Sequence, residues 1–350
     1  MELGSEYNLE LNELEVTENN LYKYLDEYNY ELFDSGRSAL KMIPVNKDKL
    51  VLLPEFVCES VINCFDIDKI LFYKINSNFE IDLSDLLEKM SEEVSTILVT
   101  HYFGKVQQTE VLNKIRSVAE KMQILIIEDT TQSLFSKTHT IGDYMIASIR
   151  KWLPIPMGGV LYSKKGIELP NVMTLKRNSD NSRSYGMILK NLYLQNKLDC
   201  NKEYRTIFGI CEEKLNYQKE NKLISDFTRF LISCEDINIL IEKRKKNYHY
   251  VAEALKNLGI LPVQNLEESE CPFALVLRMP ERDRFRQYLI NNNIYCAVHW
   301  PFAQIQEKNR IGAKYNAETL ISLPIDQRYG PETMQYMVGK IKEYGGELSF

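Results

Sequence analysis

Three short segments place chemically useful residue types at informative spacings. The segment ILIIEDTTQS, residues 124–133, carries Asp129 and Gln132 directly after an apolar run. The segment SIRKWLPIPMGG, residues 148–159, carries Ser148 three positions before Lys151 and ends in a glycine pair. The segment DSGRSAL, residues 34–40, is a small-residue turn leading into a helix, where helix-start amides could cradle an anion. Together they offer a carboxylate, an amine nucleophile and an anion cradle.

Each segment also has a purely structural interpretation. DSGRSAL can be an ordinary capped helix start, and Asp129 can simply cap the turn after its strand. Lys151 can belong to a solvated Arg-Lys pair, Ser148 can be core, and Phe56, just past another strand, can be ordinary packing. Neither GxGxxG nor GxxxxGK[ST] occurs, so the two common nucleotide-phosphate loops are missing.

Composition excludes several classes of protein. The chain has 350 residues, 44% of them hydrophobic and 26% charged, which suffices for one large or two ordinary globular domains. A formal charge of −6 argues against a general nucleic-acid binder. Seven scattered cysteines without a CxxC pair predict neither a disulfide framework nor a metal site. Without a signal peptide or an apolar run of ~20 residues, we expect a cytoplasmic chain that binds no membrane.

The elements that must position these residues alternate between strand and helix patterns. Strands are predicted at 49–56, 69–75, 95–103 and 124–129, with two more at 144–151 and 158–165; helices are predicted at 58–65, 82–90 and 110–122. This alternation indicates crossover units and a mostly parallel sheet with helices on both faces. Open sheets of this kind bind ligands at the carboxyl ends of their strands, which is where Asp129 lies.

The second half of the chain predicts a smaller α/β domain. Residues 166–224 are polar and receive no assignment. A long helix at 236–259 is followed by a strand at 272–279, a helix at 281–293, a strand at 294–300 and a helix at 331–344. We therefore expect a large domain over residues 1–230 and a small C-terminal domain over residues 231–350.

The order of the segments resembles the DegT/DnrJ/StrS family of sugar aminotransferases, which are pyridoxal-phosphate enzymes of fold type I. That family's core reads roughly SGT-AL, P-F-A, H-YG, EDAAQ, GD, S…K and GG. The corresponding segments here are SGRSAL, PEFVCES, HYFG, EDTTQS, IGDYMIAS, SIRK and MGG, with looser matches at ISDFTRFLI, RKKNY, IYCAVHWPF and ISLPIDQRY. The resemblance implies a large domain with a seven-stranded type of sheet.

The resemblance also implies a role for individual residues. Lys151 would hold the cofactor aldehyde covalently and act as general base and acid. Asp129 would keep the pyridine nitrogen protonated, so that the ring can accept electrons. Gln132 would touch the ring's 3-oxygen, and Phe56 would stack on the ring face.

The remaining implied site residues bind the phosphate or line the substrate pocket. The phosphate ligands would be Ser35, Gly36, Arg37, Ser38 and Ser148, with Asn221 reaching in from a neighbouring subunit. The substrate candidates are His101, His299 and Trp300, for each of which simple packing is the alternative.

The implied reaction moves an amino group from glutamate to a keto-sugar, most often nucleotide-linked, in a homodimer whose active site lies near the subunit interface. Such enzymes serve polysaccharide or secondary-metabolite synthesis. Two alternatives stay open: a lyase or other amino-acid-transforming enzyme of the same fold, and a non-catalytic homologue that binds a sugar nucleotide. Two departures leave the sugar undefined: Ser148 and Lys151 lie closer together than in many members, and Met157 stands where a glutamate precedes the glycine pair.

Overall fold

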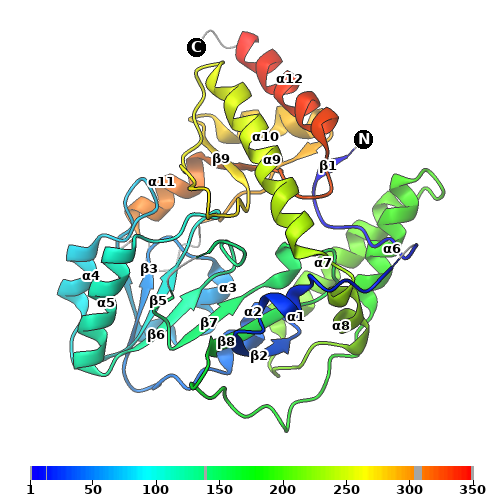
Figure 1. Cartoon of the computed structure of the whole chain (residues 1–350). Helices are drawn as coiled ribbons and strands as arrows, with labels where there is room; N and C mark the ends of the chain where they lie inside the picture. The colour runs from blue at the N-terminus through cyan, green and yellow to red at the C-terminus, as the bar shows by residue number, and fades with distance from the viewer. Residues whose placement is uncertain (1, 13, 138–139, 303–309, 348–350) are drawn as a thin grey trace. The chain divides into compact units, whose positions relative to one another are not determined.

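A computed structural model of the chain describes residues 2–12, 14–137, 140–302 and 310–347 (Figure 1). Its central feature is the expected mostly parallel sheet, with seven strands in the spatial order β2-β8-β7-β6-β5-β3-β4. These strands are β2 (Tyr28–Phe33), β3 (Leu50–Pro54), β4 (Ile70–Tyr73), β5 (Val94–Thr100), β6 (Leu125–Asp129), β7 (Tyr144–Ala147) and β8 (Gly159–Lys164).

Four strands form the parallel part of the sheet. β3 pairs with β4 and β5, and β5 pairs with β6 in a register that sets Thr100 opposite Asp129. The connections run through α3 (Glu59–Ile62), the 3₁₀ turn η1 (Ile67–Lys69), α4 (Leu83–Lys89) and α5 (Thr109–Met122). α4 and α5 lie side by side against this part of the sheet (Figure 1).

The helix α5 shows why the spacing of apolar residues predicted this part of the fold correctly. Its apolar residues recur at helical spacing, and Leu112, Ile115 and Ala119 are fully buried in the same core as the strands. Gln123 ends the helix in a left-handed conformation, at φ 55°, and β6 follows directly. The predicted helix at 110–122 and the strand at 124–129 are confirmed within one residue.

The other side of the sheet is antiparallel. β2 pairs with β8 over their whole lengths, and β8 pairs with β7. The strand β2 was not predicted, because its sequence YNYELF is polar and only its last two residues are buried. The predicted strand at 144–151 ends earlier, at Ala147, and the chain then enters the 3₁₀ turn η2 (Ile149–Lys151).

The chain forms two compact units, each assembled from separate stretches. The first unit comprises Met1–Ser5, Val45–Gly142 and Ile239–Phe350, and the second comprises Glu6–Pro44 and Asp143–Asn238. The boundary expected between residues 230 and 231 stays a prediction, because neither unit is a single continuous half of the chain.

The C-terminal part of the first unit has its own core. Its elements are β1 (Leu3–Gly4), α9 (Ile237–Lys256), β9 (Leu275–Arg278), α10 (Arg282–Asn291), β10 (Ile294–Tyr295), α11 (Ile311–Thr319), β11 (Leu320–Leu323) and α12 (Pro331–Glu347). β11 pairs antiparallel with β9, and their inward residues pack with α9, α10 and α12. The predicted strand–helix–strand–helix order is confirmed, but the strand expected at 294–300 is limited to two residues, and β11 was missed.

The second unit contains the segment that the sequence left unassigned. Residues 166–224 hold two long helices, α6 (Ser182–Leu194) and α7 (Asn201–Tyr217), which pack against each other. The unit also contains α1 (Leu21–Tyr24), α2 (Gly36–Lys41) and α8 (Asp226–Ser233).

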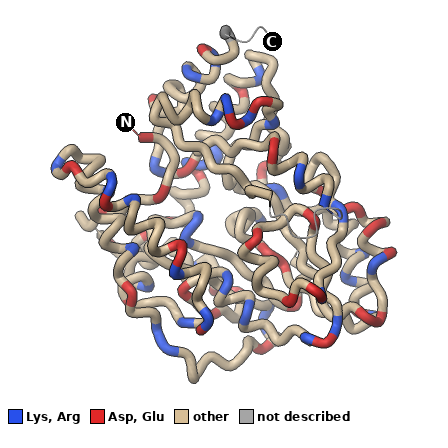
Figure 2. Tube along the Cα trace, turned by 180° about the vertical axis from the view of Figure 1, so that it is seen from behind, with Lys and Arg blue, Asp and Glu red and all other residues tan. Residues whose placement is uncertain are grey.

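Charged residues of both signs are interspersed along the trace (Figure 2). All seven cysteines are free thiols. Among the residues that the structure describes, no helix has the length and hydropathy of a membrane span, and no group of three or more His, Cys, Asp and Glu side chains has the arrangement of a metal site.

Candidate functional site

The turn before α2, the predicted anion cradle, is a capped helix start in the second unit. Ser35 is the N-cap of α2, and its Oγ accepts a hydrogen bond from the Ser38 amide at 3.1 Å. Ser35 and Ser38 are both buried, and their hydroxyl oxygens lie 3.1 Å apart. The turn is therefore held in place by its own side chains, with the amides at the start of α2 beside them.

Two glycines allow the neighbouring chain to approach this turn closely. A Cβ at Gly159, the first residue of β8, would lie 2.2 Å from the carbonyl carbon and oxygen of Ser35. A Cβ at Gly36 would lie 3.3 Å from the Cβ of Ser148. The structure thus brings Ser35, Gly36 and Ser148 together, and the close approach explains why position 159 holds a glycine. Their role as phosphate ligands stays a prediction.

Asp34 is a buried residue of this turn that the sequence analysis missed. One carboxylate oxygen accepts hydrogen bonds from the hydroxyls of Ser35 and Ser38, at 3.3 and 2.7 Å. The other accepts from the amides of Asn178 and Gln218, both at 2.9 Å. Its backbone also bonds to Lys222 and Gly158. Asp34 therefore connects the turn to the end of α7 and to the glycine pair. The local sequence does not predict these contacts.

Lys151 is the last residue of the 3₁₀ turn η2, which starts after Ser148. Its amide donates to the Ser148 carbonyl at 3.3 Å, so the two predicted residues share one turn. The side chain is half-buried, and its Nζ makes no hydrogen bond or ion pair with any described residue. An amine in this condition is available to a ligand.

Two other predicted phosphate ligands are engaged elsewhere in the second unit. The Arg37 guanidinium donates to the Asn216 side chain on α7 at 2.9 Å. Asn221 donates to the Met42 sulfur at 3.3 Å. Their predicted roles stay predictions.

In the first unit, Asp129 ends β6 and is almost buried. One of its carboxylate oxygens accepts a hydrogen bond from the Thr131 amide at 2.9 Å, which fixes the side chain over the following turn. Its carbonyl accepts from the His101 amide at 3.3 Å, in line with the parallel pairing of β5 and β6. The capping interpretation is thus correct for this oxygen, and the ligand role of Asp129 stays a prediction.

Gln132 carries a donor that the described protein leaves unsatisfied. Its side chain is 2% exposed, and its Oε1 accepts from the Phe103 amide at 2.9 Å. Its Nε2 is buried and has no hydrogen-bond partner among the described residues. A buried donor without a partner costs about 1–3 kcal/mol, so an acceptor on a ligand would remove a real penalty.

Phe56 lies in an aromatic cluster of the first unit. Its ring centroid lies 5.9 Å from Tyr102 in a stacked arrangement and 5.1 Å from Trp300. The Tyr102 hydroxyl donates to the Phe56 carbonyl at 2.6 Å. Trp300 is half-buried, so the cluster reaches the surface on that side.

The two histidines differ in accessibility. His101 is fully buried, its Nδ1 accepts from the Gln107 amide at 3.2 Å, and burial lowers the pKa of its ring to about 4. His299 is half-buried, and its Nδ1 lies 2.8 Å from the Ser322 hydroxyl. Of the two, His299 is the one that a substrate could reach.

These residues suit a phosphorylated pyridine aldehyde on grounds internal to the structure. The second unit supplies a glycine-lined turn with a capped helix start, and an amine that makes no hydrogen bond or ion pair with a described residue. The first unit supplies a carboxylate at a strand end, an unsatisfied amide donor and an aromatic ring. Each of these features matches one functional group of pyridoxal phosphate: phosphate, aldehyde, ring nitrogen, 3-oxygen and ring face.

Comparison with known proteins shows what the chain is similar to. Residues 37–149 match the DegT/DnrJ/EryC1/StrS aminotransferase family. This match covers less than half of the chain. The matched residues include Phe56, Asp129, Gln132 and Ser148. Lys151 lies two positions beyond the end of the matched segment. A curated relative, the dTDP-3-amino-3,6-dideoxy-alpha-D-galactopyranose transaminase of Aneurinibacillus thermoaerophilus, is 24% identical over 287 residues, or 77% of this chain and 70% of the relative.

Solved structures confirm that the chain has the predicted fold type. A putative sugar aminotransferase of Streptococcus pneumoniae, Spr1654 in its PMP form, matches with a TM-score of 0.65 and 16% identity over 93% of this chain and 88% of the other. An aminotransferase of the same family from Brucella abortus matches with a TM-score of 0.64 and 15% identity over 93% and 88%. The expectation of an aminotransferase with fold type I is confirmed.

Proposed function

We propose that the chain is a pyridoxal-phosphate-dependent aminotransferase that moves an amino group from glutamate to a nucleotide-linked keto-sugar. The observation that carries the cofactor assignment is the buried Nε2 of Gln132, which lacks a partner among the described residues and lies on the turn after Asp129. The curated relative is named as a transaminase of a dTDP-linked sugar, which supports the same substrate class here.

Each functional group of the cofactor would have its own ligands. Ser35, Gly36, Ser38 and Ser148 would bind the phosphate through the turn before α2, joined by Arg37 and by Asn221 of a second subunit. Gln132 would donate its Nε2 hydrogen to the ring oxygen, Phe56 would cover a ring face, and Asp129 would accept a hydrogen bond from the ring nitrogen.

When bound, the cofactor supplies an electron sink for the pair of electrons left at a carbon that loses its proton. The Lys151 Nζ takes that proton from the amino donor and delivers it to the neighbouring carbon, as general base and then general acid. Asp129 keeps the ring nitrogen protonated by holding a negative charge beside it. His299 and Trp300 are at the accessible end of the aromatic cluster and would contact the sugar.

Exposed apolar side chains and free thiols bear on the assembly and the location of the enzyme. The helices of the second unit expose large apolar side chains, among them Tyr185, Leu194, Ile210, Tyr217, Phe227 and Phe230, which a second copy of the chain would cover in a homodimer. Seven free thiols suit a reducing compartment, and we place the enzyme in the cytoplasm.

The decisive experiment is reconstitution with pyridoxal phosphate followed by borohydride reduction and peptide mass spectrometry. We expect the pyridoxyl group on Lys151, and we expect glutamate to be converted to 2-oxoglutarate when a nucleotide-linked keto-sugar is present. Label on another lysine would overturn the site assignment. Label on Lys151 without amino transfer would favour a lyase of the same fold, and failure to bind the cofactor would favour the non-catalytic homologue.

A further inference from the structure

The turn that carries Lys151 is short and cannot fix its own C-terminal carbonyls. The turn η2 spans three residues. It is held by hydrogen bonds from the backbone amides of Lys151 and Trp152 to the carbonyls of Ser148 and Ile149. The last carbonyls of any helical turn lack partners within it and need them from elsewhere. The Lys151 Nζ makes no hydrogen bond or ion pair with a described residue, so the backbone of this turn sets the point from which the side chain extends.

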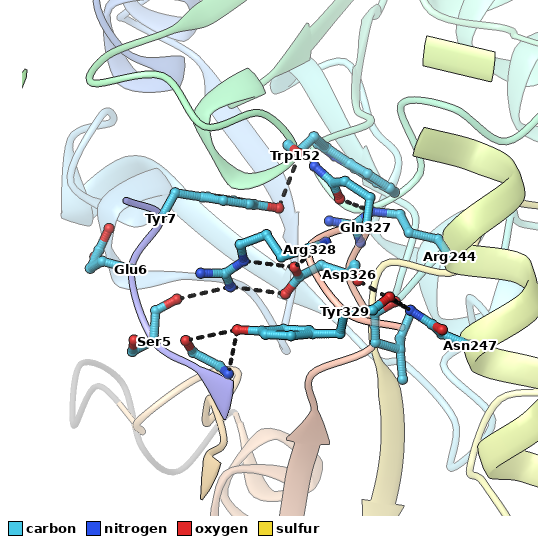
Figure 3. Close-up of polar contacts among 12 residues, drawn as sticks. Ser5, Glu6, Tyr7, Trp152, Arg244, Asn247, Asp326, Gln327, Arg328 and Tyr329 are labelled. Atoms are coloured by element: carbon cyan, nitrogen blue, oxygen red, sulfur yellow. Dashed lines mark hydrogen bonds and ion pairs between the residues drawn. The ribbon is translucent and has the colours of Figure 1, made fainter. Parts of the chain in front are cut away.

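The segment of residues 6–9, here called the N-terminal arm, supplies a hydrogen-bond partner for a carbonyl next to this turn. The hydroxyl of Tyr7 donates to the carbonyl of Trp152, one residue after Lys151, at 3.0 Å (Figure 3). Trp152 itself is fully buried, so its carbonyl is at a fixed position. A residue from the start of the chain therefore braces the peptide that follows the lysine.

The same arm reaches the residue on the other side of Lys151 through a chain of ion pairs. Arg150 contacts the Glu212 carboxylate at 2.9 Å, Arg183 contacts the same carboxylate at 2.6 Å, and Arg183 contacts Glu6 at 2.7 Å. The side chains of Arg150 and Arg183 are only 18% and 7% exposed, whereas those of Glu212 and Glu6 are 40% and 44% exposed. These charge-assisted bonds are therefore buried on the arginine side and reach solvent on the carboxylate side.

The carboxylates in this series of ion pairs stay charged at neutral pH. Burial raises the pKa values of Glu6 and Glu212, but the guanidinium groups of Arg183 and Arg150 outweigh it, and both values are lowered. Lys190 of α6 also donates to the Glu6 carbonyl, and the Leu9 amide donates to the Met187 carbonyl at 3.1 Å. The arm is thus fixed along α6 while its side chains reach the lysine turn.

We propose that Tyr7 and Glu6 are positioning residues for Lys151, which hold the lysine turn from both flanks so that the amine meets the cofactor aldehyde in one orientation. This inference rests on the proposed function. The arm continues into residues that are bound within the first unit, where Arg328 donates to the Ser5 carbonyl at 3.3 Å and the Gly4 amide donates to the Tyr329 hydroxyl at 2.8 Å (Figure 3).

The test compares Tyr7→Phe with a matched control, Tyr22→Phe. Tyr22 also lies in the second unit, and its hydroxyl makes the same kind of bond, to the Arg229 carbonyl at 3.0 Å, away from Lys151. The two variants should lose similar stability in urea unfolding. Pyridoxal phosphate affinity, measured by fluorescence titration of the full chain, should fall about three- to tenfold in Tyr7→Phe only, which is the worth of one ordinary hydrogen bond.

A second measurement does not need the cofactor. Trinitrobenzenesulfonate labels lysine amines, and peptide mass spectrometry reports the rate at each lysine. In the cofactor-free protein, Tyr7→Phe should raise the labelling rate of Lys151 at least about twofold, whereas Lys256, on α9 of the first unit, should label at an unchanged rate.

The outcomes separate the two proposals. If wild-type protein does not bind pyridoxal phosphate, the proposed function fails, while the labelling result still decides whether the arm braces the turn. If wild-type protein binds and Tyr7→Phe matches it in both affinity and labelling, or if Tyr22→Phe shifts both equally, the positioning role is wrong. Glu6→Gln should repeat the Tyr7→Phe effects more weakly, because Arg183 retains Glu212.

Discussion

Gly159 and Ser35 are packed so closely that a single added carbon on Gly159 would lie 2.2 Å from the Ser35 carbonyl. The contact is backbone against backbone, so no side-chain rotation can relieve it. We predict that Gly159→Ala destabilises the fold by about 3 kcal/mol or more and disrupts the anion cradle. Urea unfolding measures the first effect.

A matched control for this variant lies in the same unit. Gly209 is an exposed residue of α7, and a Cβ there would meet no atom within 4 Å. Gly209→Ala should leave stability unchanged or raise it by about 0.5–1 kcal/mol, because alanine is the better helix former. Equal losses in both variants would contradict the packing argument.

Asp34 concentrates four donors on one buried carboxylate, and its removal should be costly. Asp34→Ala leaves the hydroxyls of Ser35 and Ser38 and two side-chain amides without their acceptor, and we expect a loss of about 2–4 kcal/mol in urea unfolding. Asp26→Ala is the control: its carboxylate is 72% exposed and paired only with exposed Lys23, so its loss should stay within about 0.5 kcal/mol.

Gln132→Leu should separate cofactor binding from stability. The variant removes the unsatisfied Nε2 donor, but it also removes the acceptor of the Phe103 amide. The number of buried donors without a partner therefore stays the same at this site. We expect a change of about 1 kcal/mol or less in the stability of the cofactor-free protein, and a loss of about tenfold in pyridoxal phosphate affinity.

Gln107 offers the contrasting case for this prediction. It is equally buried, but both of its side-chain ends are bonded, to the Phe79 and Thr100 carbonyls and the Ile81 amide. Gln107→Leu should cost about 3 kcal/mol in stability. If Gln132→Leu behaved like Gln107→Leu in unfolding and left cofactor affinity unchanged, the donor would be structural.

His101 should make the fold sensitive to mild acid. Its pKa is about 4 in the folded protein, against about 6.5 in an unfolded chain, so only the unfolded state binds a proton between these values. Stability from this residue is complete above pH 6.5 and falls as the pH drops toward 4, by about 2 kcal/mol at pH 5. His101→Gln should reduce the loss between pH 7.5 and 5 by that amount, and the exposed His249→Gln should not.

Glu235 should act in the opposite direction. Burial raises its pKa to about 7, so the carboxylate is charged at a cost when the pH exceeds that value. Glu235→Gln should raise the free energy of unfolding by about 1–3 kcal/mol at pH 8, and the gain should vanish near pH 4, where the carboxyl is neutral in both states. A gain that does not depend on pH would refute the burial argument.

The local pattern of the sequence was enough to predict the parallel strands, the helices α4 and α5 and the order of the C-terminal elements. These features depend on periodicity and capping over a few residues, which any stretch of chain carries within itself. Residues 166–224 were not predictable in the same way, because α6 and α7 mix polar and apolar residues and pair with each other.

The chain's amino acids alone determined which residue types could meet a cofactor, through Asp129, Gln132 and Lys151 at the ends of predicted strands. Only the tertiary structure decided what holds them. The four donors on Asp34 include side chains from positions 178 and 218, and the brace behind Lys151 comes from position 7. Contacts between such distant positions leave no periodic trace, because each partner is a single polar residue whose role exists only once the chain has folded.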